Sequence, residues 1–303
     1  MSSTGSAEST RLSGQDVVHG QPDEVRHGLE RALEEPVPFH LRVDCTDKNG
    51  PRHLEVFPSG VATWDEQAQL KLEPSERTAL LKMLLEGGFA SFKSLYGGKG
   101  EAKGPLRVSC RIDLQMGELR KVSRQLAEGE QFPQLTGLAA SLLDRVAPWA
   151  KERGVEAADL GDGLEKLGQG LLSAQALRLL FIDLPSDQGR VGQIMTIEGG
   201  RASLRDYAPG RKLGGESSRI LEDSQVAALA RILQGADPAS MPVNLWADQP
   251  LDLRLSVLKH EKNLLARPFS RLTPDKLGQT QERFDRLIAQ LREFRARLFS
   301  SPD

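Results

Sequence analysis

The sequence predicts an α+β protein made of two tandem diverged repeats, each an antiparallel sheet with helices on one face. Two observations lead to this class. Stretches of alternating polar and apolar residues, typical of half-buried strands, are interleaved with amphipathic helical stretches. The same order of elements then occurs twice, with a period of about 140 residues. Three pairs of matching positions mark this period: Leu33 and Leu172, Gly60 and Gly200, and Pro133 and Pro274.

Length and composition agree with two domains. The chain has 303 residues, and domains commonly have roughly 150. Residues 1–22 are rich in Ser, Thr and Gly, so we expect a disordered tail there. The repeats are expected over 23–153 and 164–303, with a linker over 154–163. No signal-peptide pattern and no apolar run long enough to span a membrane occurs, so the expected location is cytoplasmic.

The first repeat is expected to follow the order α-βββ-α-ββ-α. Asn49-Gly50 favours a tight hairpin turn, and Gly87-Gly88 ends a helix that begins at Pro74. Strands joined by such turns are antiparallel, so we expect antiparallel pairing throughout. The expected elements are a helix striped by Val25, Leu29 and Leu33; strands over 39–45, 53–57 and 61–64; a helix over 74–85; strands over 108–114 and 119–126; and a closing helix opened by Pro133.

The second repeat follows the same order with different residues. Its first strand is more apolar than its counterpart, and a turn is expected at 187–189. The expected elements are a helix with Leu164, Leu167 and Leu171; strands over 177–184, 194–197 and 202–207; a helix with Val226, Leu229 and Leu233; a strand over 252–257; and a closing helix opened by Pro274.

The two cysteines are interpreted as buried hydrophobes. Cys45 and Cys110 each alternate with apolar residues, so both should point inward from strands. With two cysteines in the chain, we expect no disulfide framework to hold the fold. A redox or metal-binding role is the alternative.

Glycine-rich and acidic stretches do not meet the requirements of known sites. The loop over 97–104 lacks a Lys followed by Ser or Thr at the phosphate-loop spacing, and it precedes a strand, so a basic hairpin tip is expected. The stretch from Cys45 resembles the start of an EF-hand. Its twelfth position is Val56, where a calcium-binding loop needs a Glu.

Neither a metal nor a cofactor is expected. The five histidines never have zinc-helix spacing, and no CxxC occurs. His40 and His53 flank the first hairpin and should lie close together, but no carboxylate partner is obvious. No motif of a hydrolase or metalloprotease occurs. An enzyme whose catalytic groups converge between the two repeats is the alternative.

The last helix carries a candidate partner-binding surface. It has five arginines and no lysine, whereas the matching helix of the first repeat has far fewer basic residues. Arg forms forked bonds to carboxylates, which favours an acidic protein partner over a solvated face. Nucleic acid is disfavoured, because no aromatic residues are interleaved. Replacing Arg286 and Arg295 by Gln should leave thermal stability nearly unchanged. The candidate residues are Arg283, Arg286, Arg292, Arg295 and Arg297.

Each repeat resembles the emfourin-type proteins, small bacterial inhibitors of thermolysin-like metalloproteases. The similarity lies in the early hairpin, a Pro74-Ser75 helix start before Phe89, the alternating strand pair over 108–126 and a closing helix opened by Pro133. Emfourins are single units, whereas this chain has two. The resemblance implies proteinase inhibition as one version of a non-catalytic, protein-binding or regulatory function. The partner and the oligomeric state stay open.

Overall fold

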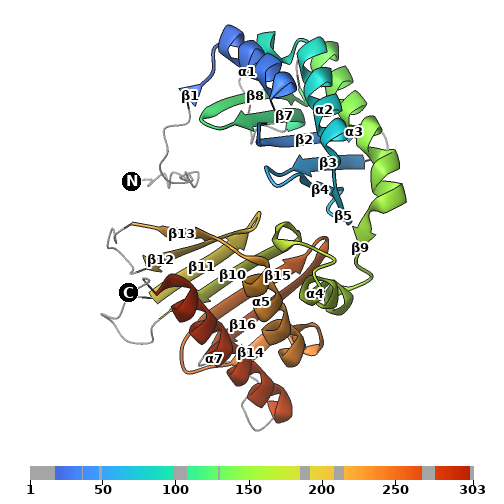
Figure 1. Ribbon diagram of the computed structural model, residues 1–303. Helices are drawn as coiled ribbons and strands as arrows, with labels where there is room; N and C mark the ends of the chain where they lie inside the picture. The colour runs from blue at the N-terminus through green and yellow to red at the C-terminus, as the bar shows by residue number, and fades with distance from the viewer. Residues whose placement is uncertain are drawn as a thin grey trace.

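The computed structural model describes residues 18–35, 37–47, 50–97, 108–128, 130–184, 192–207, 215–267 and 277–300. These residues form two α+β domains, each with helices on one face of a mainly antiparallel sheet (Figure 1). Several expectations lie wholly or partly outside them: the tail over 1–17, the turn at Asn49, the loop over 98–107, the turn at 187–189 and the helix start at Pro274.

The first domain contains one mixed sheet and three helices among the described residues. Its strands lie in the order β1-β8-β7-β2-β3-β4-β5-β9, with β6 also paired to β8. The elements are β1 (Val18–His19), α1 (Pro22–Glu34), β2 (Phe39–Asp47), β3 (Gly50–Val56), β4 (Val61–Trp64), β5 (Ala68–Lys71), α2 (Pro74–Glu86), the 3₁₀ turn η1 (Phe89–Ser91), β6 (Leu95–Tyr96), β7 (Val108–Met116), β8 (Leu119–Leu126), α3 (Pro133–Arg153) and β9 (Val155–Glu156).

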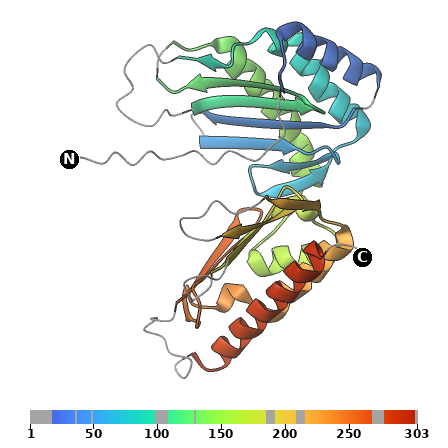
Figure 2. The ribbon, with the colours of Figure 1, turned by 90° about the vertical axis from the view of Figure 1, so that its left-hand side faces the viewer.

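The second domain has the strand order β13-β12-β11-β10-β15-β16-β14. Figure 2 shows it below the first domain. The elements are α4 (Leu160–Gly168), η2 (Ala174–Ala176), β10 (Leu177–Asp183), β11 (Gly192–Glu198), β12 (Arg201–Tyr207), β13 (Ser217–Ile220), α5 (Asp223–Ala236), η3 (Pro238–Ser240), β14 (Asn244–Trp246), β15 (Leu251–Val257), β16 (His260–Arg267) and α7 (Gln279–Phe299).

The two domains share one strand order. The strands of the two sheets can be matched in pairs, starting from β2 and β10. Across the sheets, the matched pairs follow the order β6 and β14, β8 and β16, β7 and β15, β2 and β10, β3 and β11, β4 and β12, β5 and β13. The equivalent turns contain Gly60 and Gly200, with φ of 84° and 79°, where a glycine avoids strain. The Leu72 N–H donates to Gly60 O, and the Leu221 N–H donates to Gly200 O, both at 2.9 Å.

Two details of the expected topology are wrong. Each sheet has a fourth strand in its first meander, β5 or β13, where the sequence predicts three. The pairing is also not antiparallel throughout, because β1 and β6 run parallel to β8, and β14 runs parallel to β16. The chain reaches β6 and β14 after a helix rather than a tight turn, so no hairpin fixes their direction. These strands are two or three residues long, too short to show alternation.

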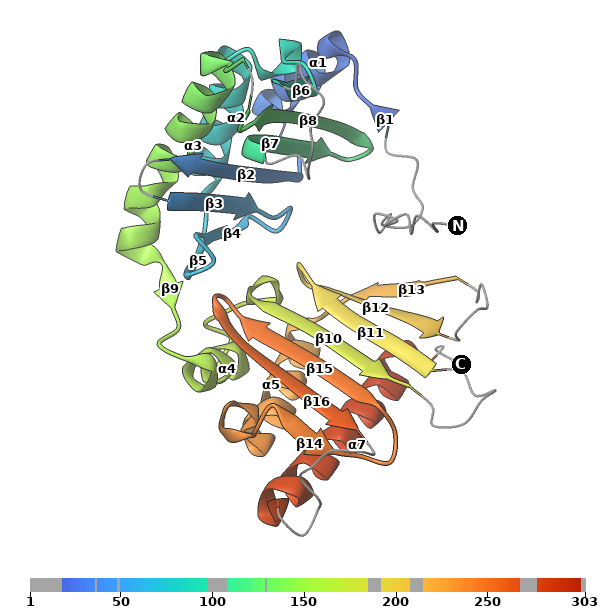
Figure 3. The same ribbon diagram turned by 180° about the vertical axis from the view of Figure 1, so that it is seen from behind.

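The helices bury one face of each sheet. In the first domain, Leu41 and Ile112 of the sheet and Leu142 of α3 belong to one buried cluster. In the second, Phe181 of β10 and Leu291 of α7 do the same. Residues that alternate with these point away from the helices, and no helix among the described residues covers the second face of either sheet (Figure 3).

The domains meet at the turn between β4 and β5. Glu66 Oε1 lies 3.0 Å from Arg178 Nη1, and the Ser173 N–H donates to Gln69 Oε1 at 2.7 Å. The stretch over 154–163, expected to be a linker, contains β9 and the first residues of α4. Because β9 pairs with β5, this connection is part of the first sheet.

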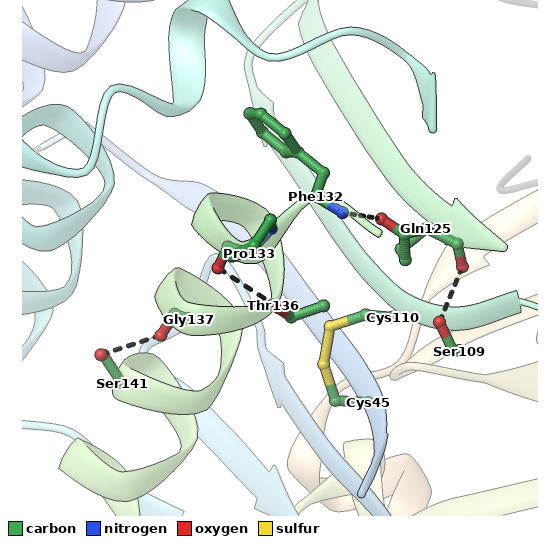
Figure 4. Close-up of a disulfide and its surroundings, with 9 residues drawn as sticks. All are labelled: Cys45, Ser109, Cys110, Gln125, Phe132, Pro133, Thr136, Gly137 and Ser141. Atoms are coloured by element: carbon green, nitrogen blue, oxygen red, sulfur yellow. Dashed lines mark hydrogen bonds between the residues drawn. A yellow bond between two sulfur atoms is a disulfide. The ribbon is translucent and has the colours of Figure 1, made fainter. Parts of the chain in front are cut away.

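The expectation of no disulfide is wrong. Cys45 on β2 and Cys110 on β7 are register partners, with Cα atoms 4.1 Å apart, and a disulfide joins them beneath the first turns of α3 (Figure 4). The strand face was predicted correctly, since Cys110 is buried and Cys45 packs on the core. Alternation alone does not reveal which residue lies opposite which, so the sequence gives no sign of the pairing.

Candidate functional site

The two uncovered sheet faces form one continuous surface. A groove of about 580 Å³ lies on the first sheet, and Glu66 is one of its lining residues. A second groove, of about 410 Å³, lies on the second sheet and includes Arg178. The ion pair between these two side chains joins the grooves at the domain junction. We refer to this surface as the open face.

A chain of five charged side chains crosses the open face of the first sheet. We call it the charged network; it consists of His40, Arg42, Asp44, His53 and Glu55. His40 Nε2 lies 2.9 Å from Glu55 Oε1, and His53 Nε2 lies 3.8 Å from Glu55 Oε2. His53 Nδ1 is 2.5 Å from Asp44 Oδ1, whose other oxygen accepts from Arg42 Nε at 2.8 Å.

The charged network favours the ionised forms of Asp44, His53 and Glu55. Burial disfavours the imidazolium of His53, but the carboxylates of Asp44 and Glu55 outweigh it and raise the pKa of His53 to about 9. Burial likewise opposes ionisation of Glu55, yet its hydrogen bond to His40 and its ion pair with His53 hold the pKa of Glu55 well below its usual value. The Asp44 pKa is also lowered, since its bonds to His53 and Arg42 outweigh burial. His53 is therefore cationic at neutral pH.

Arginines extend the charge across β7 and β8. Asp113 accepts bonds from Arg111 and Arg120, and Arg124 lies directly opposite Arg111. Arg124 is exposed, and its side chain forms no ion pair with any residue in the described ranges. This end of the open face therefore has more basic than acidic side chains.

The open face of the second sheet is apolar at its centre. We call this region the aliphatic patch; it consists of Leu180, Ile182, Ile194 and Leu265. Ile182 on β10 is the register partner of Ile194 on β11 and of Asp252 on β15. Asp252 also lies opposite Leu265, and it binds Arg254 at 3.0 Å. The aliphatic patch is thus flanked by one ion pair.

The strand ladders place the aliphatic patch and the charged region at equivalent positions. The β2–β7 and β10–β15 ladders each have a matching end, Cys45 opposite Cys110 and Asp183 opposite Leu251. Counting back from these ends matches the aliphatic patch with charged residues of the first sheet. In the order Leu180, Ile182, Ile194 and Leu265, the counterparts are Arg42, Asp44, His53 and Arg124.

The cavity at the domain junction is small. It lies among Glu55, Phe57, Gln175 and Arg178 and has a volume of about 30 Å³, far below the roughly 300 Å³ at which small-molecule pockets begin. The described residues therefore leave no room for an organic substrate at this point. Among the same residues, no group of three or more His, Cys, Asp or Glu side chains could hold a metal ion.

Two of the five candidate arginines are used inside the second domain. Arg292 donates two hydrogen bonds to the Asp183 carboxylate, from Nε at 2.9 Å and from Nη2 at 2.8 Å. Arg295 Nη2 lies 3.2 Å from the same carboxylate. The Arg295 side chain is 12% exposed and lies over the ring of Phe181. The expectation that replacing Arg295 leaves stability unchanged assumed an exposed side chain, and this burial contradicts it.

The other three arginines lie along a different side of α7. On a helix of 3.6 residues per turn, separations of 3 and 11 residues place Arg283, Arg286 and Arg297 within about 60° of one another, so they share one side of α7. Arg283 lies 3.6 Å from Asp237, and Arg297 lies 3.7 Å from Glu293. Arg286 is exposed, and no described residue bonds to its side chain.

His40 and His53 are expected from the sequence to lie close together, with no obvious carboxylate partner. The structure supplies two, Glu55 and Asp44. The signal was present in the alternation, because His40, Arg42 and Asp44 occupy every second position of one strand. Recognising it requires treating the polar face of a strand as a possible site rather than as solvent-exposed surface.

Within the described residues, no helix has both the length and the apolarity needed to cross a membrane. Comparison with protein-family models finds no match, and a search of curated proteins finds none either.

Proposed function

We infer that the protein is a non-catalytic, protein-binding or regulatory protein that holds a partner protein on its open face. The aliphatic patch is the observation that supports this function. The same fold has charged side chains at the equivalent positions of the first sheet, so packing does not require Leu180, Ile182, Ile194 and Leu265 to be apolar. An apolar cluster with a polar rim on an uncovered face is typical of a protein-contact surface.

The partner should combine aliphatic and acidic side chains. The aliphatic patch favours the former, because contact with the half-buried Leu180, Ile182 and Leu265 removes apolar surface from water, whereas Ile194 is only 7% exposed. Arg124 and the neighbouring Arg111 favour the latter, since carboxylates bind arginine in a forked geometry. On α7, Arg283, Arg286 and Arg297 form a separate candidate surface for an acidic protein, because α7 covers the face of the second sheet opposite the aliphatic patch.

Proteinase inhibition is the specific version suggested by the emfourin resemblance. The direct test is the rate of peptide hydrolysis by thermolysin with increasing amounts of the protein. This version predicts that an equimolar amount suppresses hydrolysis and that the chain stays intact. Undiminished hydrolysis at a large excess of the protein contradicts inhibition while leaving other binding functions open.

An enzyme with its site between the repeats is the alternative. The small cavity at the junction, with about 30 Å³ of space, gives this alternative no support. Groups on the open face, chiefly His53 and the arginines around it, would have to carry any reaction.

A substitution on the aliphatic patch tests the proposed function. Ile182→Lys places a cation beside Asp252, which can pair with it, so the fold should tolerate the change. Affinity capture from the native cell extract should recover a specific partner with the unmodified protein and lose it with Ile182→Lys. The matched control is Leu171→Lys, at an exposed leucine outside the open face. Equal recovery with both variants would place binding elsewhere.

The proposed location is the cytoplasm, and the cysteine pair provides a test. Cytosolic thiols are kept reduced, so disulfides are rare there. In cells quenched with acid and treated with a thiol reagent, a cytoplasmic chain should be labelled at Cys45 and Cys110. Unlabelled, bonded cysteines in freshly quenched cells would indicate an oxidising compartment.

A further inference from the structure

The equivalent edges of the two sheets differ in one respect. In the first sheet, β5 is followed outward by β9, and the register pairs are Gln69 with Val155 and Ala68 with Glu156. In the second sheet, β13 pairs with β12 and with no other strand among the described residues. Among the described residues, one edge is therefore covered by a further strand and its counterpart is not.

The backbone groups at the uncovered edge can be assigned. The Leu221 N–H donates to Gly200 O, so this pair is a hydrogen-bonded pair of the β12–β13 ladder. Hydrogen-bonded pairs alternate along an antiparallel ladder, so the amides of Arg219 and Ser217 also point to β12. The N–H and C=O groups of Ser218 and Ile220 then point away from the sheet. Gln69 has the same position on β5, where β9 pairs with it.

The side chains at this edge have a definite character. All four residues of β13 are exposed, and Ile220 is 75% exposed, the most exposed of the large hydrophobic residues in the described ranges. Ile220 lies opposite Arg201, and Arg219 points to the other face, where its guanidinium donates to Ser300 O. A free edge with an exposed isoleucine would ordinarily invite aggregation unless another strand covers it.

We propose that β13 is a docking edge for an extended, acidic segment of the partner protein, which adds to the second sheet as an antiparallel strand in the way that β9 adds to the first. An apolar residue of that segment lies across from Ile220, and acidic residues lie on the other face, near Arg219. Main-chain bonds to Ser218 and Ile220 supply affinity, and the side chains supply specificity. This inference rests on the proposed binding function but concerns the backbone edge of the second sheet rather than the aliphatic patch.

A short capped peptide of alternating valine and glutamate serves as the probe. Its binding is followed by chemical-shift changes and by hydrogen exchange of the Ser218 and Ile220 amides in the full chain. Both amides should exchange fast in the free protein and slow at least tenfold with saturating peptide. A peptide of alternating valine and lysine should bind at least tenfold more weakly, because its lysines lie on the face of the sheet that carries Arg219.

Ser218→Pro separates strand addition from other modes of binding. Proline removes the outward N–H but none of the N–H groups that bond to β12, and edge strands tolerate it. The matched control is Ser218→Ala, which loses the same hydroxyl contact with Arg201 but keeps the N–H. Peptide binding should be lost in Ser218→Pro and retained in Ser218→Ala.

Each other outcome overturns the inference. Binding of neither peptide, or equal binding by Ser218→Pro, excludes strand addition. Protection that is present in the free protein shows that the edge is already covered, by the chain itself if it is independent of concentration and by a second copy if it appears with dimerisation. None of these outcomes depends on Ile182→Lys, so failure of the docking edge is distinguishable from failure of the open face.

Discussion

The ion-pair cluster around Asp183 gives the sharpest stability prediction. Its carboxylate is 9% exposed and accepts bonds from Arg292 and Arg295, which tie α7 to the end of β10. Asp183→Asn keeps the shape but removes the charge that compensates the buried Arg295 guanidinium. Arg286→Gln, on the same helix, is the matched control, because that side chain is exposed.

The magnitude follows from burial. Breaking a buried ion pair from one side costs roughly 3–5 kcal/mol. Arg292 is 43% exposed and can turn to water, so the lower end applies, about 3 kcal/mol for Asp183→Asn. Arg286→Gln should change stability by less than about 0.5 kcal/mol. Denaturant unfolding, followed by a probe of the second domain, measures both.

The pH dependence provides a second check on the same variant. Burial alone would raise the pKa of Asp183. The bonds to Arg292 and Arg295 outweigh burial, so the pKa of Asp183 lies below its usual value. A carboxylate whose pKa is lowered on folding stabilises the protein at pH values above its unfolded pKa of about 3.9. This stabilisation is lost as the pH falls through the pKa of the folded state. The gap between the unmodified protein and Asp183→Asn should therefore be full at neutral pH and shrink below about pH 4. An Asp183→Asn variant as stable as Arg286→Gln at pH 7 would refute the reasoning.

Three further predictions concern other parts of the structure. The pKa of His53 is raised to about 9, so its contribution to stability is complete below pH 6.5 and is lost as the pH rises through 9. Over this pH range, the unfolding free energy of the unmodified protein should fall by on the order of 2 kcal/mol more than that of His53→Gln. Reducing the disulfide, which spans 65 residues, should cost about 4 kcal/mol in denaturant unfolding, and a variant with both cysteines replaced by Ala should not respond to the reductant. Gly163→Ala should lower stability by about 1–3 kcal/mol, because its Cβ would lie 2.8 Å from Val257; an unchanged melting temperature would contradict that packing.

The sequence predicted the elements that have long, regular patterns. The alternation over 39–45 corresponds to a strand, and the apolar stripe that begins after Pro133 corresponds to a helix, as expected. Burial of one face imposes a two-residue period on a strand and a 3.6-residue period on a helix. The fourth strands and the parallel edge strands were missed. They contain two to four residues each, and their existence depends on pairing with a distant strand rather than on their own pattern.

The candidate site could be predicted only in part. The arginines of α7 were identified by composition, but composition does not show that Asp183, more than a hundred residues away, binds two of them. The aliphatic patch was visible as an unusually apolar first strand in the second repeat. Its meaning depended on knowing which face of β10 the helices leave uncovered, and that is set by tertiary packing.

The central claim is that a partner contacts the open face, and site-specific photo-crosslinking tests it most directly. A photo-reactive residue placed at Ile182 in the full chain should form one defined adduct in the native cells, and the second-site change Leu265→Lys on the same patch should abolish it. The same probe at Arg286 on α7 should give no adduct with that protein. An adduct from Arg286 that is absent from Ile182, or one from Ile182 that survives Leu265→Lys, would contradict binding through the open face.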